Sequence, residues 1–494
     1  MNQNIEQKPA CPAGRYETVI GLEVHLQLST QTKIFCGCAN VFGREPNTQT
    51  CPVCLGLPGT LPVLNKMALE YALKIAMALD CQINPVIKFD RKNYYYPDLP
   101  KGYQISQFDK PVAYDGYLWM TTADGQTKKI NIKRAHLEED AGKLVHDDRN
   151  NSSLVDYNRT GTPLMEIVSE PELHSPQEAY DYLQALKLTL EYLHVSDCDM
   201  EKGSLRCDAN VSIREAGAKP FGIKTELKNM NSFKAVRTAL EFEEKRQREV
   251  VASGGRIIQE TRLWSEEKET TIAMRSKEEA HDYRYFPEPD LVPFKISEAL
   301  IEEVRRSIPE LPRQKFERFV GEYKLSEYDA RIIIADQHIA HFFEACTKLY
   351  GDTKKICNWL NGPLLQELNA RKMDFKNIKF KPEDLVTIIR KVDQNELSNL
   401  SAKETLKQVL DTGKDVVSVI RDAGLAQVSD SSALEGIVDE LIREHQNVVA
   451  QIREGKASAI GFLVGQAMRK SQGKANPKMI GEIIQRKLSN KNDA

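Results

Sequence analysis

The chain has 494 residues, of which 41% are hydrophobic and 28% are charged, and its formal net charge is -3. This length predicts about three domains. No apolar run approaches the roughly 20 residues that a membrane-spanning helix needs, and the small net charge argues against a uniformly basic nucleic-acid binder. The first fifteen residues hold no apolar stretch of the secretory kind, so we expect a cytoplasmic protein without a membrane partner.

Strand-like runs with a period of two dominate the first 300 residues, interrupted by a few helices. The runs are "TVIGLEVHLQL" (18–28), "KKINIKRAHLEED" (128–140), "LRCDANVSIR" (205–214) and "FGIKTELKN" (221–229). Their short connections favour a largely antiparallel sheet over a doubly wound parallel one. Helices are predicted at 65–80, at 175–193, where Ser175 and Glu178 form a capping box, and at 233–252 before Gly254.

From about residue 300 the pattern becomes almost entirely helical. Capping boxes are predicted at Ser401 with Glu404 and at Ser432 with Glu435. From Arg453 onward the chain has nine basic and three acidic residues, which gives a local charge of about +6. We therefore expect an α+β protein with three domains: a sheet domain over 1–300, a helical domain over 301–422 and a small helical tail over 423–494.

Four cysteines form the strongest local motif, "FCGCANVFGREPNTQTCPVC". Cys36 and Cys38 lie two apart, and Cys51 and Cys54 form a C-x-x-C. Two such knuckles can close a tetrahedron of thiolates around a structural zinc ion. One alternative is that the four cysteines are free or buried thiols. The other is a redox-active C-x-x-C, which is disfavoured because two cysteine pairs occur together in this segment.

Polar residues recur on one face of each of the four strand runs. Alternation puts Glu23, His25 and Gln27 on one face of the first run, opposite aliphatic residues. The other three faces hold His136, Glu138 and Asp140; Arg206, Asp208, Asn210 and Ser212; and Lys224, Glu226 and Lys228. Any one face is typical of a solvated sheet. Together, carboxylates with imidazole favour a Mg²⁺ or Mn²⁺ site that handles nucleotide phosphates.

Two further stretches mix cations with tyrosines. Residues 90–107, "DRKNYYYPDLPKGYQISQ", contain Lys92 and Lys101, and residues 274–291 contain Arg275, Lys277, Asp282, Arg284 and Tyr285. Each stretch is either a packed loop with a salt-bridged seam or a wall of the site in which cations meet phosphate or carboxylate oxygens. The sequence leaves both alternatives open.

Long, uncommon strings of this chain resemble the GatB family, one of the subunits of the tRNA-dependent amidotransferase. In chain order they are "ETVIGLEVHLQL", "CPVCLGLPGTLPV", "RKNYYYPDLPKGYQISQ", "HLEEDAGK", "DYNRTGTPLMEIVSEPEL", "MEKGSLRCDANVSI", "TELKNMNSF" and "GFLVGQAMRKSQGKANP". The resemblance covers nearly the whole chain.

The resemblance implies a heterotrimeric ligase used in translation. Its amidase subunit releases ammonia from glutamine, and its small third subunit ties the complex together. The GatB subunit binds Glu-tRNA(Gln) or Asp-tRNA(Asn) and phosphorylates the side-chain carboxylate with ATP, after which ammonia displaces the phosphate. The implied fold is a cradle domain on an antiparallel sheet, then a helical domain, then a tail domain that binds tRNA.

The resemblance also implies roles for individual residues. Glu23, His25 and Glu138 correspond to the family's Mg²⁺ region, and Lys92 and Lys101 to polar positions on its ammonia route. The four cysteines match its zinc knuckle. Strand phase adds Asp208, Glu226 and Arg206 as expected ATP-binding residues, and Glu138 or a neighbour as a proton acceptor for ammonium.

Two other functions compete with this interpretation. A zinc-bearing scaffold that binds tRNA without chemistry needs the knuckle and the basic tail, whereas only the enzyme needs Glu23, His25 and Glu138 to converge. A free-standing phosphotransferase acting on a small acid would leave the basic tail unexplained.

Overall fold

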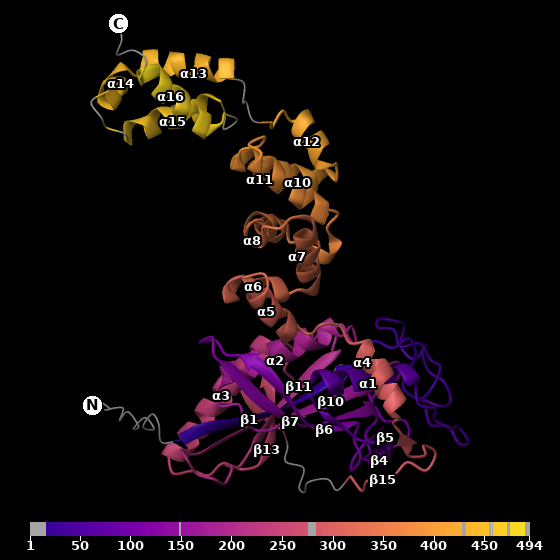
Figure 1. Ribbon diagram of the computed structural model, residues 1–494. Helices are drawn as coiled ribbons and strands as arrows, with labels where there is room; N and C mark the ends of the chain where they lie inside the picture. Colours follow the sequence, from indigo (N-terminus) through magenta and orange to yellow (C-terminus); the bar gives the residue numbers. More distant parts are fainter. Residues whose placement is uncertain are drawn as a thin grey trace, which may run out of the picture. The chain divides into compact units, whose positions relative to one another are not determined.

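The computed structural model describes residues 16–147, 150–274, 283–426, 431–453, 456, 458–471 and 475–489. The chain divides into two compact units, Met1–Pro312 and Arg313–Ala494. The first contains all the strands of the described residues and the second only helices, so the α+β prediction is confirmed (Figure 1). Within the described ranges no helix is both long and apolar enough to cross a bilayer.

A nine-stranded sheet forms the centre of the first unit, in the order β14-β13-β12-β11-β1-β10-β7-β6-β2. Every neighbouring pair is antiparallel except β12 and β13, which are parallel. The strand bounds are β1 Tyr16–Gln27, β2 Gln82–Ile83, β6 Ala113–Thr121, β7 Thr127–Glu139, β10 Pro163–Ser169, β11 Leu205–Glu215, β12 Thr225–Lys228, β13 Glu260–Ser265 and β14 Thr270–Ala273. The four runs with period two thus lie in this sheet.

Three helices cover the apolar face of this sheet: α1 (Lys66–Ala78), α2 (Pro176–Tyr192) and α3 (Phe233–Ala252) (Figure 1). Their apolar stripes share one core with the inward residues of β1, such as Leu22, Val24 and Leu26. Ser175 caps α2 by accepting from the Glu178 N–H, as the sequence predicted. With its apolar face packed, β1 turns Glu23 and His25 to the other side.

Seven short strands form three smaller sheets beside the nine-stranded one. Their bounds are β3 Val86–Ile87, β4 Asp90–Asn93, β5 Tyr103–Ser106, β8 Lys143–Asp147, β9 Ser152–Asp156, β15 Phe286–Pro287 and β16 Phe294–Lys295. β4 pairs with both β5 and β15, so the two tyrosine-rich stretches are neighbours in space. The first unit ends with α4 (Glu298–Arg306), which packs on α1.

The second unit is built from helices around two hydrophobic cores. The helices of the first core are α5 Pro312–Gly321, α6 Glu327–Ile334, α7 Gln337–Leu349, α8 Thr353–Trp359, α9 Leu365–Arg371, α10 Pro382–Asp393, α11 Asn399–Thr412 and α12 Val416–Asp422, with a π-helical turn at Leu360–Leu364 and a 3₁₀ turn at Phe375–Asn377. The second core joins α13 Ser431–Glu444, α14 Gln446–Arg453, α15 Ser458–Lys470 and α16 Pro477–Ser489.

One predicted helix start in this unit is wrong. Helix α11 begins three residues before the predicted box, because Ser398 accepts from the Ser401 N–H and acts as N-cap. Ser401 is buried in the first turn instead. Gly413 ends the helix with a φ of 66°, a conformation that glycine adopts without steric cost.

Candidate active site and metal centres

The polar face of the sheet brings together residues from β1, β7 and β10. His25 on β1 lies opposite Glu166 on β10, and Glu166 lies opposite His136 on β7. Paired residues on neighbouring strands share a face, so the three side chains form a row across the sheet. Glu138, two residues further along β7, joins the row from the same face.

Three of these side chains converge on one point. One ligand atom each from His25, Glu138 and Glu166 lies within 4.8 Å of the other two. The His25 Nε2 is 3.3 Å from the Glu166 Oε2. Two carboxylates and one imidazole without thiols suit a hard divalent ion, and opposite oxygens around Mg²⁺ lie about 4.2 Å apart. The donors therefore fit a single Mg²⁺ or Mn²⁺ after small side-chain movements.

Two neighbours hold the carboxylates of this group. The His136 Nε2 lies 3.5 Å from the Oε2 atoms of both Glu138 and Glu166, and the Ser106 hydroxyl donates to Glu138 at 3.0 Å. His136 is 2% exposed and Glu138 3%. Partners of this kind fix the orientation of metal ligands.

The same contacts set the charges of the group. Burial alone would lower the pKa of His25, but the hydrogen bond and charge of Glu166 raise it. Burial alone would raise the pKa of Glu166, but His136 and His25 lower it well below the ordinary range. Glu138 is also held as a carboxylate, because the hydrogen bond with His136 lowers its pKa against the effect of burial. Both acids are thus anions ready to bind a cation.

A second acidic group lies on β1, β11 and β12, one strand over. The Lys228 Nζ lies 2.7 Å from the Asp208 Oδ2 and 3.0 Å from the Glu226 Oε1. Glu23 is directly opposite Asp208, and its Oε1 accepts from the Asn210 Nδ2 at 3.0 Å. The structure thus places Glu23 with Asp208 and Glu226, outside the group formed by His25, Glu138 and Glu166.

The pKa of Glu23 is shifted in the opposite direction from that of its neighbour Glu226. Burial, together with the charges of Glu166, Glu226 and Asp208, raises the pKa of Glu23. The pKa of Glu226 is lowered, because Lys228 outweighs the effect of burial. Glu23 is therefore the better proton acceptor, since a carboxylate of raised pKa holds a proton more firmly.

Arg206 is engaged within the protein. Its Nη2 donates to the Asp140 Oδ1 at 2.9 Å, and Gln27 donates to the other oxygen of Asp140 at 2.7 Å. This contact joins the ends of β1, β7 and β11. Arg206 opposes His25 on the sheet and so borders the metal-ligand group.

Lys92 stands between the tyrosines of the two loop stretches. Its Nζ lies 4.9 Å from the ring centre of Tyr283 and 6.0 Å from that of Tyr94. Burial alone would lower its pKa, but the charges of Glu138 and other neighbours raise it, so Lys92 is a firm cation beside the acids. Tyr285 stacks on Phe108 at 4.4 Å. Of the stretch predicted as seam or wall, Arg275, Lys277 and Asp282 lie outside the described residues.

Lys101 lies in a different place. It forms a buried ion pair with Glu139, whose Oε1 also accepts from the Ile105 N–H at 2.9 Å. Both residues line a cavity of about 180 Å³ that also borders Cys36 and Cys54. Successive residues of a strand point to opposite faces, so Glu138 serves the metal-ligand group and Glu139 the cavity.

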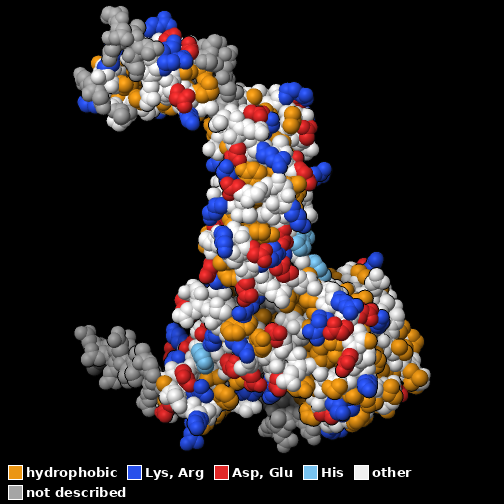
Figure 2. Space-filling model, in the orientation of Figure 1, with side chains coloured by type: hydrophobic (Ala, Val, Ile, Leu, Met, Phe, Trp, Pro, Cys, Tyr) orange, Lys and Arg blue, Asp and Glu red, His pale blue; other side chains and the backbone are white. Residues whose placement is uncertain are grey.

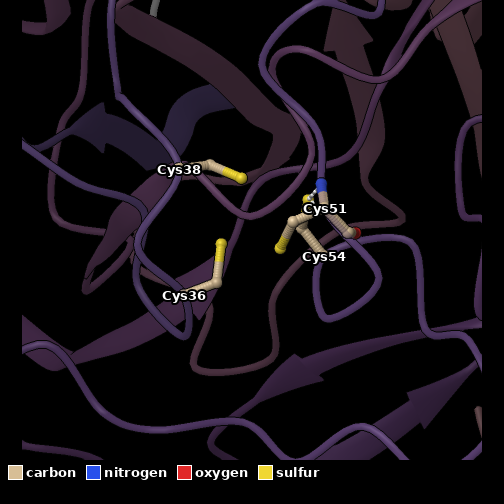
Figure 3. A group of neighbouring side chains, drawn as sticks. All are labelled: Cys36, Cys38, Cys51 and Cys54. Atoms are coloured by element: carbon tan, nitrogen blue, oxygen red, sulfur yellow. Dashed lines mark hydrogen bonds between the residues drawn. The ribbon is translucent and has the colours of Figure 1, made fainter.

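The four cysteines gather in the loop between β1 and α1. Their sulfur atoms all lie within 4.8 Å of one another and face a common space (Figure 3). Sulfurs around a tetrahedral zinc, with Zn–S bonds of about 2.3 Å, are about 3.8 Å apart. The residues therefore fit zinc, and the hydrogen bond with Cys36 lowers the pKa of the Cys54 thiol.

The cysteine loop has an apolar outer surface. Figure 2 shows hydrophobic side chains gathered on the sheet unit, in the region that Figure 1 colours indigo. The exposed members on this segment are Val41, Phe42, Leu57, Leu61 and Val63. Exposed apolar side chains gathered in this way are typical of surfaces that contact other proteins.

The prediction from sequence named His25 and Glu138, and placed His136 on the same polar face as Glu138, but it missed Glu166. The signal for Glu166 was present: it is the only acid in the strand "PLMEIVS", which is otherwise almost entirely apolar. An isolated buried carboxylate needs a partner or a cation. The strand pairing then shows which partner it has.

Comparison with known proteins identifies the family of this chain. A family described as "GatB/GatE catalytic domain" matches residues 18–302, and one described as "GatB domain" matches residues 341–488. The B subunit of the aspartyl/glutamyl-tRNA(Asn/Gln) amidotransferase of Carboxydothermus hydrogenoformans is 51% identical over 96% of this chain and 99% of its own length. The protein of the same name from Brevibacillus brevis is 52% identical over the same shares. The chain belongs to the GatB family of amidotransferase B subunits.

Proposed function

We propose that this chain is the subunit that amidates Glu-tRNA(Gln), Asp-tRNA(Asn) or both, using ATP and ammonia. The single observation that supports this most is the convergence of His25, Glu138 and Glu166 on one point of the sheet. A tRNA-binding scaffold without chemistry has no use for three converging ligand groups, two of which, Glu138 and Glu166, are buried carboxylates held by His136 and Ser106. The enzyme is a ligase that forms a carbon–nitrogen bond.

The reaction explains why an acidic face is needed. A carboxylate is a poor acyl donor because its leaving group would be oxide, whereas the leaving group of an acyl phosphate is phosphate. ATP therefore transfers its terminal phosphoryl group to the side chain of the glutamate or aspartate on the tRNA, and ammonia then displaces phosphate. A Mg²⁺ ion at His25, Glu138 and Glu166 would offset the repulsion between phosphate oxygens and the carboxylate.

The second acidic group would border the nucleotide and accept a proton from ammonium. Glu23, Asp208 and Glu226, with Lys228 and Arg206, would border the nucleotide on the strands next to the metal ligands. Attack by ammonium requires the loss of a proton before a carbon–nitrogen bond can form. Glu23 is the acceptor we assign, because its pKa is raised while that of Glu138 is lowered.

The two lysines have separate roles. Lys92, a cation beside Glu138, would orient phosphate oxygens or the substrate carboxylate at the acidic face. Lys101 and Glu139 line the cavity on the other side of β7, and this polar lining supports a route for ammonia toward the acids. Zinc at Cys36, Cys38, Cys51 and Cys54 would fix the loop that walls this cavity.

The proposed reaction requires partners that supply ammonia and the charged tRNA. An amidase subunit would supply ammonia, and the apolar surface of the cysteine loop supports a contact with it or with a small third subunit. The small domain over 423–494 would bind tRNA. Several of its cations pair with acids of α13, as Lys470 does with Glu440 and Glu444 and Lys487 with Asp439. Arg453, Lys456, Arg469 and Lys478 have no ion pair among the described residues and remain for phosphate.

The test is to purify the chain with its amidase and small partner subunits and to supply Glu-tRNA(Gln) or Asp-tRNA(Asn). We expect Gln-tRNA or Asn-tRNA to form only with ATP and Mg²⁺. Ammonium chloride should replace glutamine, because it bypasses the amidase. If neither nitrogen source gives a product and neither tRNA stimulates ATP cleavage, the chain is a scaffold and the proposal is wrong.

A further inference from the structure

Lys33 is the most unusual charged residue of the sheet unit, because its side chain is completely buried. Lysine is almost never fully buried unless it is paired, since removing an ammonium from water costs several kcal/mol. Its carboxylate partner is missing: among the described residues, no Asp or Glu forms an ion pair with Lys33. Some other anion must therefore balance this charge.

The Lys33 ammonium points to the cysteine group. Its Nζ lies 3.7 Å from the Cys54 Sγ, and it donates to the Tyr157 carbonyl at 3.4 Å. An ideal Cβ on Gly161 would lie 3.5 Å from both the Lys33 Cδ and the Cys54 Cβ, so the lysine stem and Cys54 both pack against Gly161. Backbone hydrogen bonds from the Lys33 N–H to the Cys38 carbonyl and from the Ile34 N–H to the Gly161 carbonyl fix the backbone from which this side chain extends.

The nearby carboxylates are already matched with other cations. The cavity beside the cysteines is lined by Lys33, Arg91, Lys101, Glu139 and Asp290. Glu139 pairs with Lys101, and Asp290 lies 3.5 Å from Arg91. Lys33 is left with a sulfur atom as its anionic neighbour.

We propose that Lys33 is a positioning residue of the zinc site, whose ammonium balances the charge of the metal-loaded cysteine group through the Cys54 sulfur. Four cysteine thiolates together with one Zn²⁺ ion carry a net charge of about -2. A fixed cation beside them stabilises the metal-loaded group. An N–H donor to sulfur also orients the thiolate, as partners of metal ligands generally do.

The test measures zinc affinity and not activity. The full-length chain, its K33M variant and its K33Q variant are equilibrated with buffered free zinc, and bound zinc is measured by mass spectrometry. We expect K33M to bind zinc about 10- to 100-fold more weakly, the range seen when partners of metal ligands are removed. K33Q, which keeps an N–H donor without the charge, should lie between K33M and the parent chain.

The matched control is K315M. Lys315 is also buried, but it pairs with Glu344 at 2.8 Å in the helical unit, so its loss should leave zinc affinity unchanged. The Co²⁺-loaded forms provide a second readout, since a change at Cys54 shifts the sulfur-to-metal absorption. If K33M fails to fold by circular dichroism, K33Q decides. Zinc affinity equal to that of the parent chain in the folded variants would overturn the proposal, as would a parent chain that takes up no zinc.

Discussion

The two candidate metal centres of the sheet unit are assembled in opposite ways. The cysteine group comes from one loop, Cys36 to Cys54, whereas His25, Glu138 and Glu166 come from three strands that lie far apart along the chain. A loop site depends on its metal for shape, because few strand bonds hold it. A sheet site is placed by strand pairing before any ion arrives. We therefore expect damage to the first to affect mainly stability and damage to the second mainly chemistry.

Substitution of Glu166 should have the largest effect on activity. E166Q keeps the size of the side chain but removes one of two carboxylates that would hold Mg²⁺. Several kcal/mol of charge stabilisation would be lost, so tRNA-stimulated ATP cleavage should fall about a thousandfold or more. The measurement is phosphate release with Glu-tRNA(Gln). The control E17Q lies on the same strand as His25, where Glu17 pairs with Arg214, and should stay active; equal losses in both variants would contradict the assignment.

Removal of the small tail domain should affect tRNA binding and spare the acidic face. A chain that stops at residue 426 should bind tRNA about tenfold or more weakly, with a shallower salt dependence, because each lost phosphate contact lowers the slope by about 0.7 to 0.9. Binding is measured by filter retention at several salt concentrations. An unchanged slope would show that tRNA is held by other parts of the chain.

Loss of the cysteine group should reveal its structural character. C36S with C54S removes two zinc ligands, so the thermal midpoint of the zinc-loaded chain should fall by several degrees. ATP cleavage at 25 °C should fall by roughly tenfold at most, since the acidic face is held by the sheet. Calorimetry and phosphate release are measured on the same preparation. Loss of cleavage as complete as in E166Q would remove the distinction between the two centres.

Substitution of Glu243, an acid with a structural role, should have the smallest effect on activity. Glu243 is buried under the sheet and accepts from Arg246 at 2.6 and 2.9 Å. Burial alone would raise its pKa, but Arg246 lowers it. E243Q should cost about 3 kcal/mol of unfolding free energy at neutral pH with little loss of activity. Because the folded pKa is depressed, the difference from the parent chain should shrink as pH falls below about 4.3; urea unfolding at pH 7 and 4 checks this.

The sequence alone predicted what depends on local pattern. Alternation in β1 put Glu23 and His25 on one face, spacing placed the cysteines together, and Ser175 marked the start of α2. The register was out of reach: nothing in one strand says that His25 opposes Glu166 and that Glu23 opposes Asp208. A shift of two residues would exchange these partners without changing the hydrophobic pattern. Lys33 was missed because its neighbour Cys54 is 21 residues away and its burial has no local signal.

The central claim is that one divalent ion binds between His25, Glu138 and Glu166. Crystals of the complex soaked with Mn²⁺ test it directly by anomalous scattering. We predict a peak within about 2.3 Å of the His25 Nε2 and of one oxygen each from Glu138 and Glu166. A peak only among Glu23, Asp208 and Glu226, or no peak on this face of the sheet, would contradict it.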